Sequence, residues 1–144
     1  MKAIIQRVGN ASVSVDGKII GKINQGFLVL LAIHENDPEE IIEKMAEKII
    51  KLRIFSDKNE KMNLSILDIK GEILLISQFT LYGDIKKGNR PSFLESARPE
   101  KAEKFYNRLV EKLKEKTKVE IGKFGANMEI KQTNNGPVTI IIEL

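Results

Sequence analysis

The segment Phe27-Leu28-Val29-Leu30-Leu31-Ala32-Ile33 is apolar at every position and directly follows the turn residues Asn24-Gln25-Gly26. A strand with one face in water alternates apolar and polar residues, so an unbroken apolar run indicates a strand covered on both faces. We therefore predict that this segment is the central strand of a sheet. A second run, Ile73 to Ile76, predicts another buried strand, which we expect to extend from Glu72 to Leu81.

Further strands are predicted before and after these two. Residues 2–8 alternate, and Ser12–Val15 is joined to Lys18–Ile23 by Asp16-Gly17, a pair that favours the type I′ turn of a β-hairpin. Leu52–Phe55 is predicted as a short strand, and strands interrupted by glycines are expected from Val119 onward. The chain should therefore open with a meander and close with strands.

Two amphipathic helices are predicted between the strands. Asp37 is placed as the N-cap of the first, with Pro38 at its first helical position, and Pro99 opens the second. One face of each helix is apolar, so both should pack on the sheet and form a single mixed α/β domain over residues 1–144, with an antiparallel or mixed sheet. The apolar residues are Ile41, Ile42, Met45, Ala46, Ile49 and Ile50 in the first helix and Ala102, Phe105, Tyr106, Leu109, Val110 and Leu113 in the second.

The composition restricts the possible chemistry. The chain has 144 residues, no cysteine and one histidine, His34, which excludes thiol nucleophiles and a His-rich metal centre within one chain. We expect neither a metal nor a cofactor. No apolar run reaches the ~18 residues of a membrane span, and no basic segment leads into an apolar one at the N-terminus, so a cytoplasmic protein is expected. The net charge of +4 is compatible with an RNA partner without requiring one.

The candidate catalytic residues follow the second apolar run: Ser77, Gln78, Phe79 and Thr80. If the strand continues through them, Gln78 and Thr80 share one face and Ser77 and Phe79 the other. A Ser-His-Asp triad is not expected, because it would need His34 and the sequence has no Gly-x-Ser-x-Gly elbow. A hydroxyl without a base is a poor nucleophile, so these groups are better suited to donating hydrogen bonds to an oxyanion. The other interpretation is that Ser77 and Thr80 only cap the strand end.

Two further segments contain candidate binding residues. The Gly136-Pro137 pair precedes a β-branched run, and proline is also tolerated simply as the first residue of a strand. The loop from Gly83 to Arg98 is too rich in glycine and proline for regular structure. Its basic residues are expected either to meet nucleic-acid phosphates or to remain solvated; they are Lys86, Lys87 and Arg90.

Several of these motifs resemble one family. Ser77-Gln78-Phe79-Thr80-Leu81 and Asn134-Asn135-Gly136-Pro137-Val138-Thr139 resemble the two signature motifs of the D-aminoacyl-tRNA deacylases, editing enzymes that hydrolyse D-amino acids off tRNA. Other matching segments follow the family's order over nearly the whole chain: Ile5–Val8, Asp16-Gly17, Leu52–Phe55, Lys61–Ser65, Arg90–Phe93 and Phe124–Ala126. The resemblance therefore covers the chain rather than one motif.

The resemblance implies an assembly and a reaction. It implies a homodimer in which a Gly-cisPro pair, here Gly136 and Pro137, reaches into the partner's pocket and rejects L-amino acids. Glycine has no Cβ, so backbone carbonyls can crowd the Cα of the bound aminoacyl group. The resemblance also implies that the 2′-hydroxyl of the terminal adenosine of tRNA assists catalysis and that mischarged glycyl-tRNA(Ala) is cleaved.

Arg7 receives a role through the same resemblance and three apolar residues receive one from their side-chain type, each with a second interpretation. Arg7 is expected to hold the Gly-Pro loop or else to face solvent. Phe79, Phe124 and Met128 are expected to form an apolar wall for the terminal adenine or else to belong to the core, and Asn134 is expected to support substrate binding. The alternatives for the whole protein are a noncatalytic nucleic-acid-binding dimer of the same fold and an ester or peptide hydrolase with Thr80 as nucleophile.

Overall fold

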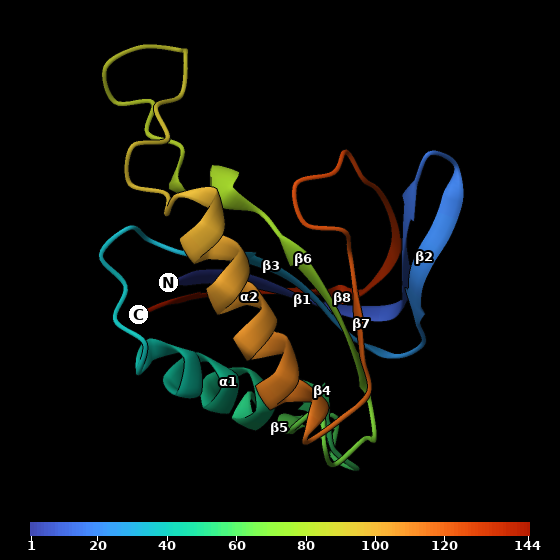
Figure 1. The fold of residues 1–144 in the computed structure, drawn as a ribbon. Helices are drawn as coiled ribbons and strands as arrows, with labels where there is room; N and C mark the ends of the chain where they lie inside the picture. Colours follow the sequence, from blue (N-terminus) through green and yellow to red (C-terminus); the bar gives the residue numbers. More distant parts are fainter.

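The structure is a computed structural model that describes residues 1–144. Its main sheet is built around β3 (Gly26–Ala32), which pairs with β1 (Lys2–Val15) on one side and, in parallel, with β6 (Glu72–Ser77) on the other (Figure 1). The segment predicted to be central is therefore central. The remaining strands of this sheet are β2 (Lys18–Ile23), which continues the pairing along the second half of β1, β7 (Val119–Ile121), which pairs with β6, and β8 (Glu129–Glu143), which pairs with β1 along its other edge.

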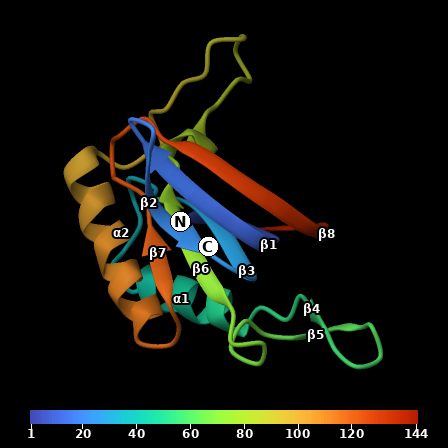
Figure 2. The same cartoon turned by 90° about the vertical axis from the view of Figure 1, so that its right-hand side faces the viewer.

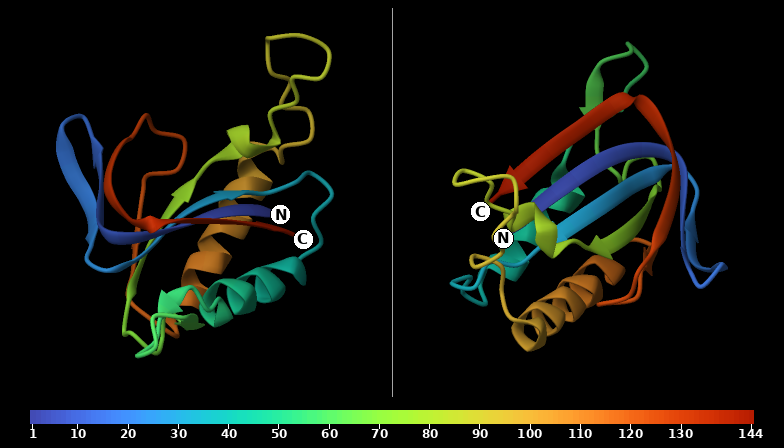
Figure 3. Two further views of the ribbon diagram at one scale, coloured as in Figure 1. Left: turned by 180° about the vertical axis from the view of Figure 1, so that it is seen from behind. Right: turned by 90° about the horizontal axis from the view of Figure 1, so that it is seen from above.

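Both helices lie on one face of this sheet, as Figures 1 and 2 show. They are α1 (Ile41–Lys51) and α2 (Pro99–Lys114), and their predicted apolar faces are buried in the larger hydrophobic cluster with Phe27, Val29, Ile73 and Leu75. A smaller cluster fills the opposite face, where β1 curves with β2 over the sheet (Figure 3). The predicted single α/β domain with a mixed sheet and two packed helices is confirmed. Neither helix is both long enough and apolar enough to span a membrane.

Three boundary predictions are wrong. The strand predicted from Glu72 to Leu81 ends at Ser77, and Phe79–Tyr82 forms a 3₁₀ turn. The first helix begins at Ile41 with Glu40 as its N-cap, because the carboxylate of Asp37 is occupied by other partners described below. Leu52–Phe55 contributes only Phe55 to a strand, since β4 (Phe55–Ser56) pairs with β5 (Met62–Leu64) in a separate two-stranded sheet.

Gly26 sets the distance between the two central strands. A Cβ on Gly26 would lie 1.8 Å from the carbonyl oxygen of Glu72. Overpacking by one methyl group typically costs about 1–3 kcal/mol, and here the clashing atom is backbone that cannot change rotamer. We expect Gly26→Ala to lower the free energy of unfolding by about 3 kcal/mol, measured by urea denaturation.

Gly9→Ala is the matched control for this substitution. A Cβ on Gly9 would meet its nearest neighbour, the carbonyl oxygen of Thr133, only at 3.9 Å. The control variant should therefore unfold at a urea concentration close to that of the unchanged chain. Equal midpoints for Gly26→Ala and Gly9→Ala would show that β3 and β6 can separate at Gly26 without cost.

Candidate active site at the end of strand β6

A cavity of about 450 Å³ opens where β3 and β6 end and α2 begins. Three of the four predicted catalytic residues line it, together with one of the predicted aromatic residues. Its lining residues are Leu31, Ala32, Ile33, Ser77, Gln78, Phe79, Phe93, Ser96, Ala97, Arg98, Pro99, Ala102, Phe124 and Gly125. Sites at the carboxyl end of parallel strands, beside a helix N-terminus, are common in α/β proteins.

The end of β6 explains how consecutive residues reach one cavity. The backbone N–H of Gln78 donates to the carbonyl of Leu31 at 2.7 Å, and the chain then turns, with the N–H of Leu81 donating back to the carbonyl of Gln78 at 3.2 Å. The predicted alternation of Gln78 and Thr80 against Ser77 and Phe79 is therefore wrong. Because the strand stops, Ser77, Gln78 and Phe79 all face the cavity.

Thr80 lies beside the cavity rather than in its wall. Its side chain is exposed, and its Oγ1 accepts a hydrogen bond from Nε2 of Gln78 at 2.5 Å. The same Gln78 side chain lines the cavity. Thr80 can therefore influence the site by orienting the amide of Gln78.

Aromatic rings form two walls of the cavity. Phe79 meets Phe93 edge to face, with ring centroids 5.1 Å apart, and Phe124 packs against Tyr106 at 6.1 Å. The hydroxyl of Tyr106 donates to the carbonyl of Leu75 at 2.7 Å, and burial raises the pKa of this tyrosine. Two walls of aromatic carbon suit the flat face of a ring-bearing ligand.

Met128 is placed away from Phe79 and Phe124. Its side chain packs with the smaller hydrophobic cluster, on the face of the sheet opposite the helices, and it is not in the cavity wall. Met128 lies close to Gly122, where a Cβ would come within 2.5 Å of its sulfur. In this chain its surroundings are those of a core residue.

The cavity contains no pair of groups for acid–base catalysis. Its lining includes no Asp, Glu, His, Lys or Cys, and Arg98 is its only ionisable side chain. The single histidine is engaged elsewhere, since Nδ1 of His34 accepts the N–H of Asn36 at 3.0 Å. No group of three or more His, Cys, Asp or Glu residues is placed to hold a metal ion. The site can offer hydrogen-bond donors and apolar walls, but it has no general base of its own.

Gly136 and Pro137 lie on the exposed strand β8, far from this cavity in the same chain. Ser77 is in register with Leu31, Ala3 and Ile142 across the sheet. Pro137 is separated from Ser77 by three strand spacings of about 4.8 Å across the sheet and by five residues of about 3.3 Å rise along it. These two displacements are perpendicular, so together they place the residues roughly 20 Å apart. The peptide bond between Gly136 and Pro137 is cis, and Gly136 has a φ of 126°.

Arg7 connects the Gly-Pro segment to the β4 region. Its Nε donates to the carbonyl of Asn135 at 3.0 Å, and its Nη1 donates to the carbonyl of Ile54. The guanidinium is half-buried and also lies against Gly136, where a Cβ would meet Nη2 at 2.8 Å. Arg7 thus holds the backbone on both sides of it, whereas Asn134 is exposed opposite Val8.

The predicted phosphate-binding residues are all exposed in the loop after the 3₁₀ turn. Lys86, Lys87 and Arg90 lie between Asp84 and Ser92, which pair with each other and close the loop into a projecting hairpin-like segment (Figure 1). This loop has no helix or strand, as predicted. It projects from the same end of the sheet at which the cavity opens.

Sequence reasoning missed the part of the cavity supplied by residues 93–98. Phe93, Ser96 and Arg98 all line it. Phe93 belongs to a segment that carries the family resemblance, so it was detectable, but Ser96 and Arg98 reach the cavity only through long-range contacts. The N–H of Ala97 donates to the carbonyl of Ile33 at 2.9 Å, which brings this loop beside the end of β3.

The fold and the cavity define a small α/β protein with one apolar, donor-bearing site. Residues 4–143 match the family model described as D-Tyr-tRNA(Tyr) deacylase. Proteins named D-aminoacyl-tRNA deacylase from Thermosipho melanesiensis and Clostridium beijerinckii are each 54% identical to this chain, over 99% of it and 97% of their own lengths. A solved structure named c-Myc DNA Unwinding Element Binding Protein superimposes with a TM-score of 0.94 at 43% identity, covering 100% of this chain and 99% of the other.

The chain therefore belongs to the D-Tyr-tRNA(Tyr) deacylase family and is an enzyme of a family of hydrolases named for acting on aminoacyl-tRNA. A structure described as a probable eukaryotic D-amino acid tRNA deacylase shares the fold, with a TM-score of 0.86 at 15% identity over 99% of this chain and 98% of the other. The family resemblance predicted from the two motifs is confirmed.

Proposed function

We propose that the protein hydrolyses the ester that joins a D-amino acid to the 3′ end of tRNA. Water adds to the ester carbonyl, the bond from that carbon to the ribose oxygen breaks, and free tRNA and the D-amino acid leave. The observation that carries this proposal is the cavity itself: it supplies donors and aromatic walls but no base. Such a site suits an ester, whose carbonyl needs stabilisation as an oxyanion, more than it suits a reaction that needs protein acid–base groups.

The donors come from the turn that follows β6. In a helical turn the first N–H groups have no partner within the turn, and here these belong to Phe79 and Thr80. Together with the hydroxyl of Ser77 and the amide of Gln78, they are proposed to stabilise the oxyanion. The rings of Phe79 and Phe124 would hold the terminal adenosine, with Asn134 supporting substrate binding from the partner.

The nucleophile is proposed to be activated by the substrate. The 2′-hydroxyl of the terminal adenosine lies next to the ester and would position the attacking water and relay its proton to the departing 3′-oxygen, a task for which no side chain of the cavity is suited. This assignment leaves Thr80 as an orienting residue for Gln78, since its Oγ1 already accepts the hydrogen bond from that amide.

Chiral selection is proposed to come from a second subunit. Gly136 and Pro137 lie roughly 20 Å from Ser77 in one chain by strand geometry, which supports a homodimer in which each cavity receives the pair from its partner. Light scattering at physiological ionic strength, the condition expected for a cytoplasmic protein, should report a dimer. A monomer that retained full selectivity between D and L esters would contradict this arrangement.

The loop after the 3₁₀ turn is proposed to hold tRNA phosphates. We expect the triple substitution Lys86→Gln, Lys87→Gln and Arg90→Gln to weaken tRNA binding and to reduce the slope of log affinity against log salt by about 2, because each lost phosphate contact removes about 0.7–0.9. Binding of deacylated tRNA would be measured over a series of KCl concentrations.

The control for this triple variant removes the same charge from another surface. Lys44, Lys48 and Lys51 are exposed on α1, and their replacement by glutamine should leave the salt slope within about 0.5 of the unchanged protein. Equal loss of slope in both variants would indicate that the loop has no special role and that only the net charge matters.

A noncatalytic nucleic-acid-binding dimer is the second candidate function. It is favoured by one observation, the close match to a protein whose name describes binding to a DNA unwinding element. Catalytic amounts of the protein incubated with D-tyrosyl-tRNA distinguish the two candidates. Turnover of many equivalents of ester supports the deacylase, whereas tight nucleic-acid binding without ester loss supports the binding module.

A further inference from the structure

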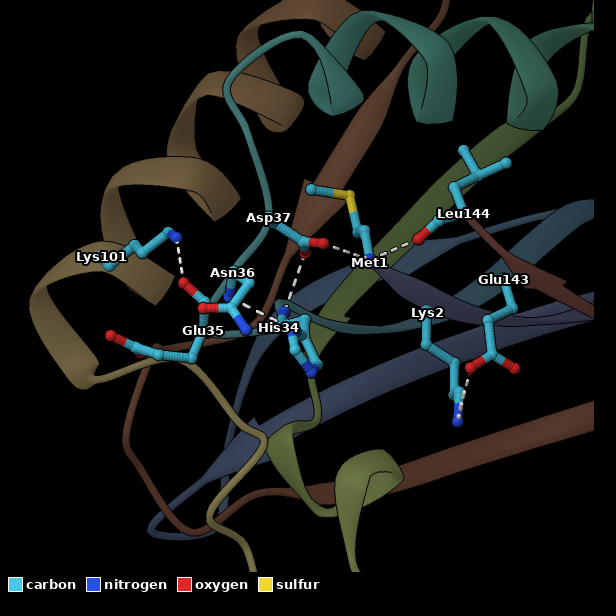
Figure 4. A network of polar contacts seen from close by, with 9 residues as sticks. All are labelled: Met1, Lys2, His34, Glu35, Asn36, Asp37, Lys101, Glu143 and Leu144. Carbon is cyan, nitrogen blue, oxygen red and sulfur yellow. Dashed lines mark hydrogen bonds and ion pairs between the residues drawn. The ribbon is translucent and has the colours of Figure 1, made fainter.

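The N-terminal ammonium group is buried in a polar network beside the segment that follows β3 (Figure 4). The nitrogen of Met1 donates to Oδ1 of Asp37 at 2.7 Å and to the carbonyl of Leu144 at 2.9 Å, and neither Met1 nor Asp37 is exposed. An ion pair removed from water in this way is stable only when its remaining hydrogen bonds are also satisfied. The other carboxylate oxygen, Oδ2 of Asp37, accepts the backbone N–H of His34 at 2.8 Å.

This network fixes the segment that continues from the central strand. His34 pairs with Ser96, and the N–H of Glu35 donates to the carbonyl of Glu95 at 3.0 Å. Lys101 on α2 donates to the carbonyl of Glu35, as Figure 4 shows. Ser96 lines the cavity, so the network determines where one wall of the cavity stands.

The same network reaches the 3₁₀ turn through Tyr82, the last residue of that turn. The ring of His34 meets the ring of Tyr82 edge to face at 5.2 Å, and Nζ of Lys2 lies 5.0 Å from the centre of the Tyr82 ring. Lys2 also pairs with Glu143 at 3.3 Å. Tyr82 is 8% exposed, and burial, followed by the charges of Asp37, Glu143 and Glu95, raises its pKa. Its ring is therefore in contact with both a histidine ring and a cation.

We infer that Tyr82 is a positioning residue: through its contacts with His34 and Lys2, it fixes the angle of the turn whose first residues, Phe79 and Thr80, carry the N–H groups proposed to stabilise the oxyanion. This inference rests on the proposed function, because it assigns the turn a role in the reaction. Phe79 and Thr80 are exposed, and a four-residue turn has little structure of its own to hold it. The anchored ring at its far end supplies that rigidity, and displacement of a reacting group by about 1 Å can cost up to about 10²-fold in rate.

The test compares three variants on D-tyrosyl-tRNA. Tyr82→Leu removes the ring and should lower kcat about tenfold while KM changes less than about twofold, because the loop proposed to hold the tRNA phosphates is untouched. Tyr82→Phe keeps the contacts of the ring with His34 and Lys2 and should retain kcat within about twofold. Lys2→Met keeps the length of a partly buried side chain and is expected to fold, but it removes the cation and with it the ion pair to Glu143. Its kcat should fall about threefold.

A double-mutant cycle separates positioning from general stability. If Lys2 acts through the Tyr82 ring, Lys2→Met should have no further effect on kcat in the Tyr82→Leu background. Independent losses that multiply, or a folded Tyr82→Leu variant with unchanged kcat, would overturn the inference. If Tyr82→Leu does not fold, Lys2→Met with unchanged kcat would overturn it instead.

A spectroscopic measurement tests the geometry without relying on activity. The chain has two tyrosines, Tyr82 and Tyr106, so protein labelled with 3-fluorotyrosine should give two ¹⁹F resonances, assigned with Tyr106→Phe. Lys2→Met should shift the Tyr82 resonance and leave that of Tyr106 in place, and an unshifted Tyr82 resonance would contradict the clamp. Absence of any ester hydrolysis by the unchanged protein would instead remove the proposed function, whatever the resonances show.

Discussion

D-tyrosine should be released rapidly from D-tyrosyl-tRNA by catalytic amounts of the protein, while L-tyrosyl-tRNA is hydrolysed at least about 100-fold more slowly. The physical reason is a steric filter made of backbone. Crowding an added group into a site that cannot relax costs about 3 kcal/mol at the upper end, and each 1.36 kcal/mol is tenfold in rate. The filter is proposed to be the Gly136-Pro137 segment of the partner, held by the hydrogen bond from Arg7 to the carbonyl of Asn135.

Arg7→Ala tests whether the filter depends on this support. Without the guanidinium the Gly-Pro segment is free to move, so the ratio of D to L hydrolysis should fall about tenfold, mainly through faster loss of the L ester. Arg53→Ala is the matched control, because Arg53 donates to Asn63 on the neighbouring β5 strand and not to the Gly-Pro segment. Its ratio should not change.

Glycyl-tRNA extends the same test, because glycine has no side chain for a steric filter to reject. Mischarged glycyl-tRNA(Ala) should therefore be cleaved at a rate closer to that of the D ester than to that of the L ester. Resistance of the glycyl ester would count against selection by rejection alone. Loss of both tyrosyl esters would keep the hydrolase and discard the filter.

The course of the central strands was predictable because burial on both faces leaves a clear mark in the sequence. Phe27 to Ile33 has no polar residue, and the strand that it forms is covered by the helices on one face and by the curved hairpin on the other. The amphipathic helices were predictable for the same reason. Both patterns can be recognised from residues close together in the sequence, because they depend on which faces of a strand or helix are buried.

The end of β6 was not predictable from the same signals. Phe79 and Leu81 continue the alternation of apolar residues, yet the N–H of Gln78 makes a last bond to Leu31 of the neighbouring β3, and the N–H of Leu81 then closes a turn onto the carbonyl of Gln78. The start of the first helix was mispredicted for a similar reason. Asp37 is a residue type that favours the N-cap position, but its carboxylate binds the N-terminal ammonium, 36 positions away. Met128 was expected to share an apolar wall with Phe124, but the sheet separates their side chains.

Removing the 2′-hydroxyl from the terminal adenosine of the substrate should have an equally large effect on the rate. A tRNA that ends in 2′-deoxyadenosine, with D-tyrosine on the 3′-oxygen, should be hydrolysed at least about 100-fold more slowly than the natural ester, because general-base assistance is typically worth about 10²–10⁴-fold. The cavity has no Asp, Glu, His or Lys to replace the missing hydroxyl. Competition against the natural ester would establish that the deoxy substrate still binds.

Thr80→Ala separates two mechanisms, because a threonine nucleophile predicts an inactive variant and activation of water by the substrate's 2′-hydroxyl predicts an active one. If Thr80 only orients the amide of Gln78 across the 2.5 Å hydrogen bond, its loss should lower kcat no more than about tenfold, in keeping with one weakened oxyanion donor. Thr80→Ser, which keeps the hydroxyl, should be nearly unchanged under either mechanism and so controls for folding. An inactive Thr80→Ala protein that was folded, together with normal hydrolysis of the deoxy ester, would transfer the nucleophilic role to Thr80. Turnover by Thr80→Ala together with a resistant deoxy ester would leave the 2′-hydroxyl as the group that activates water.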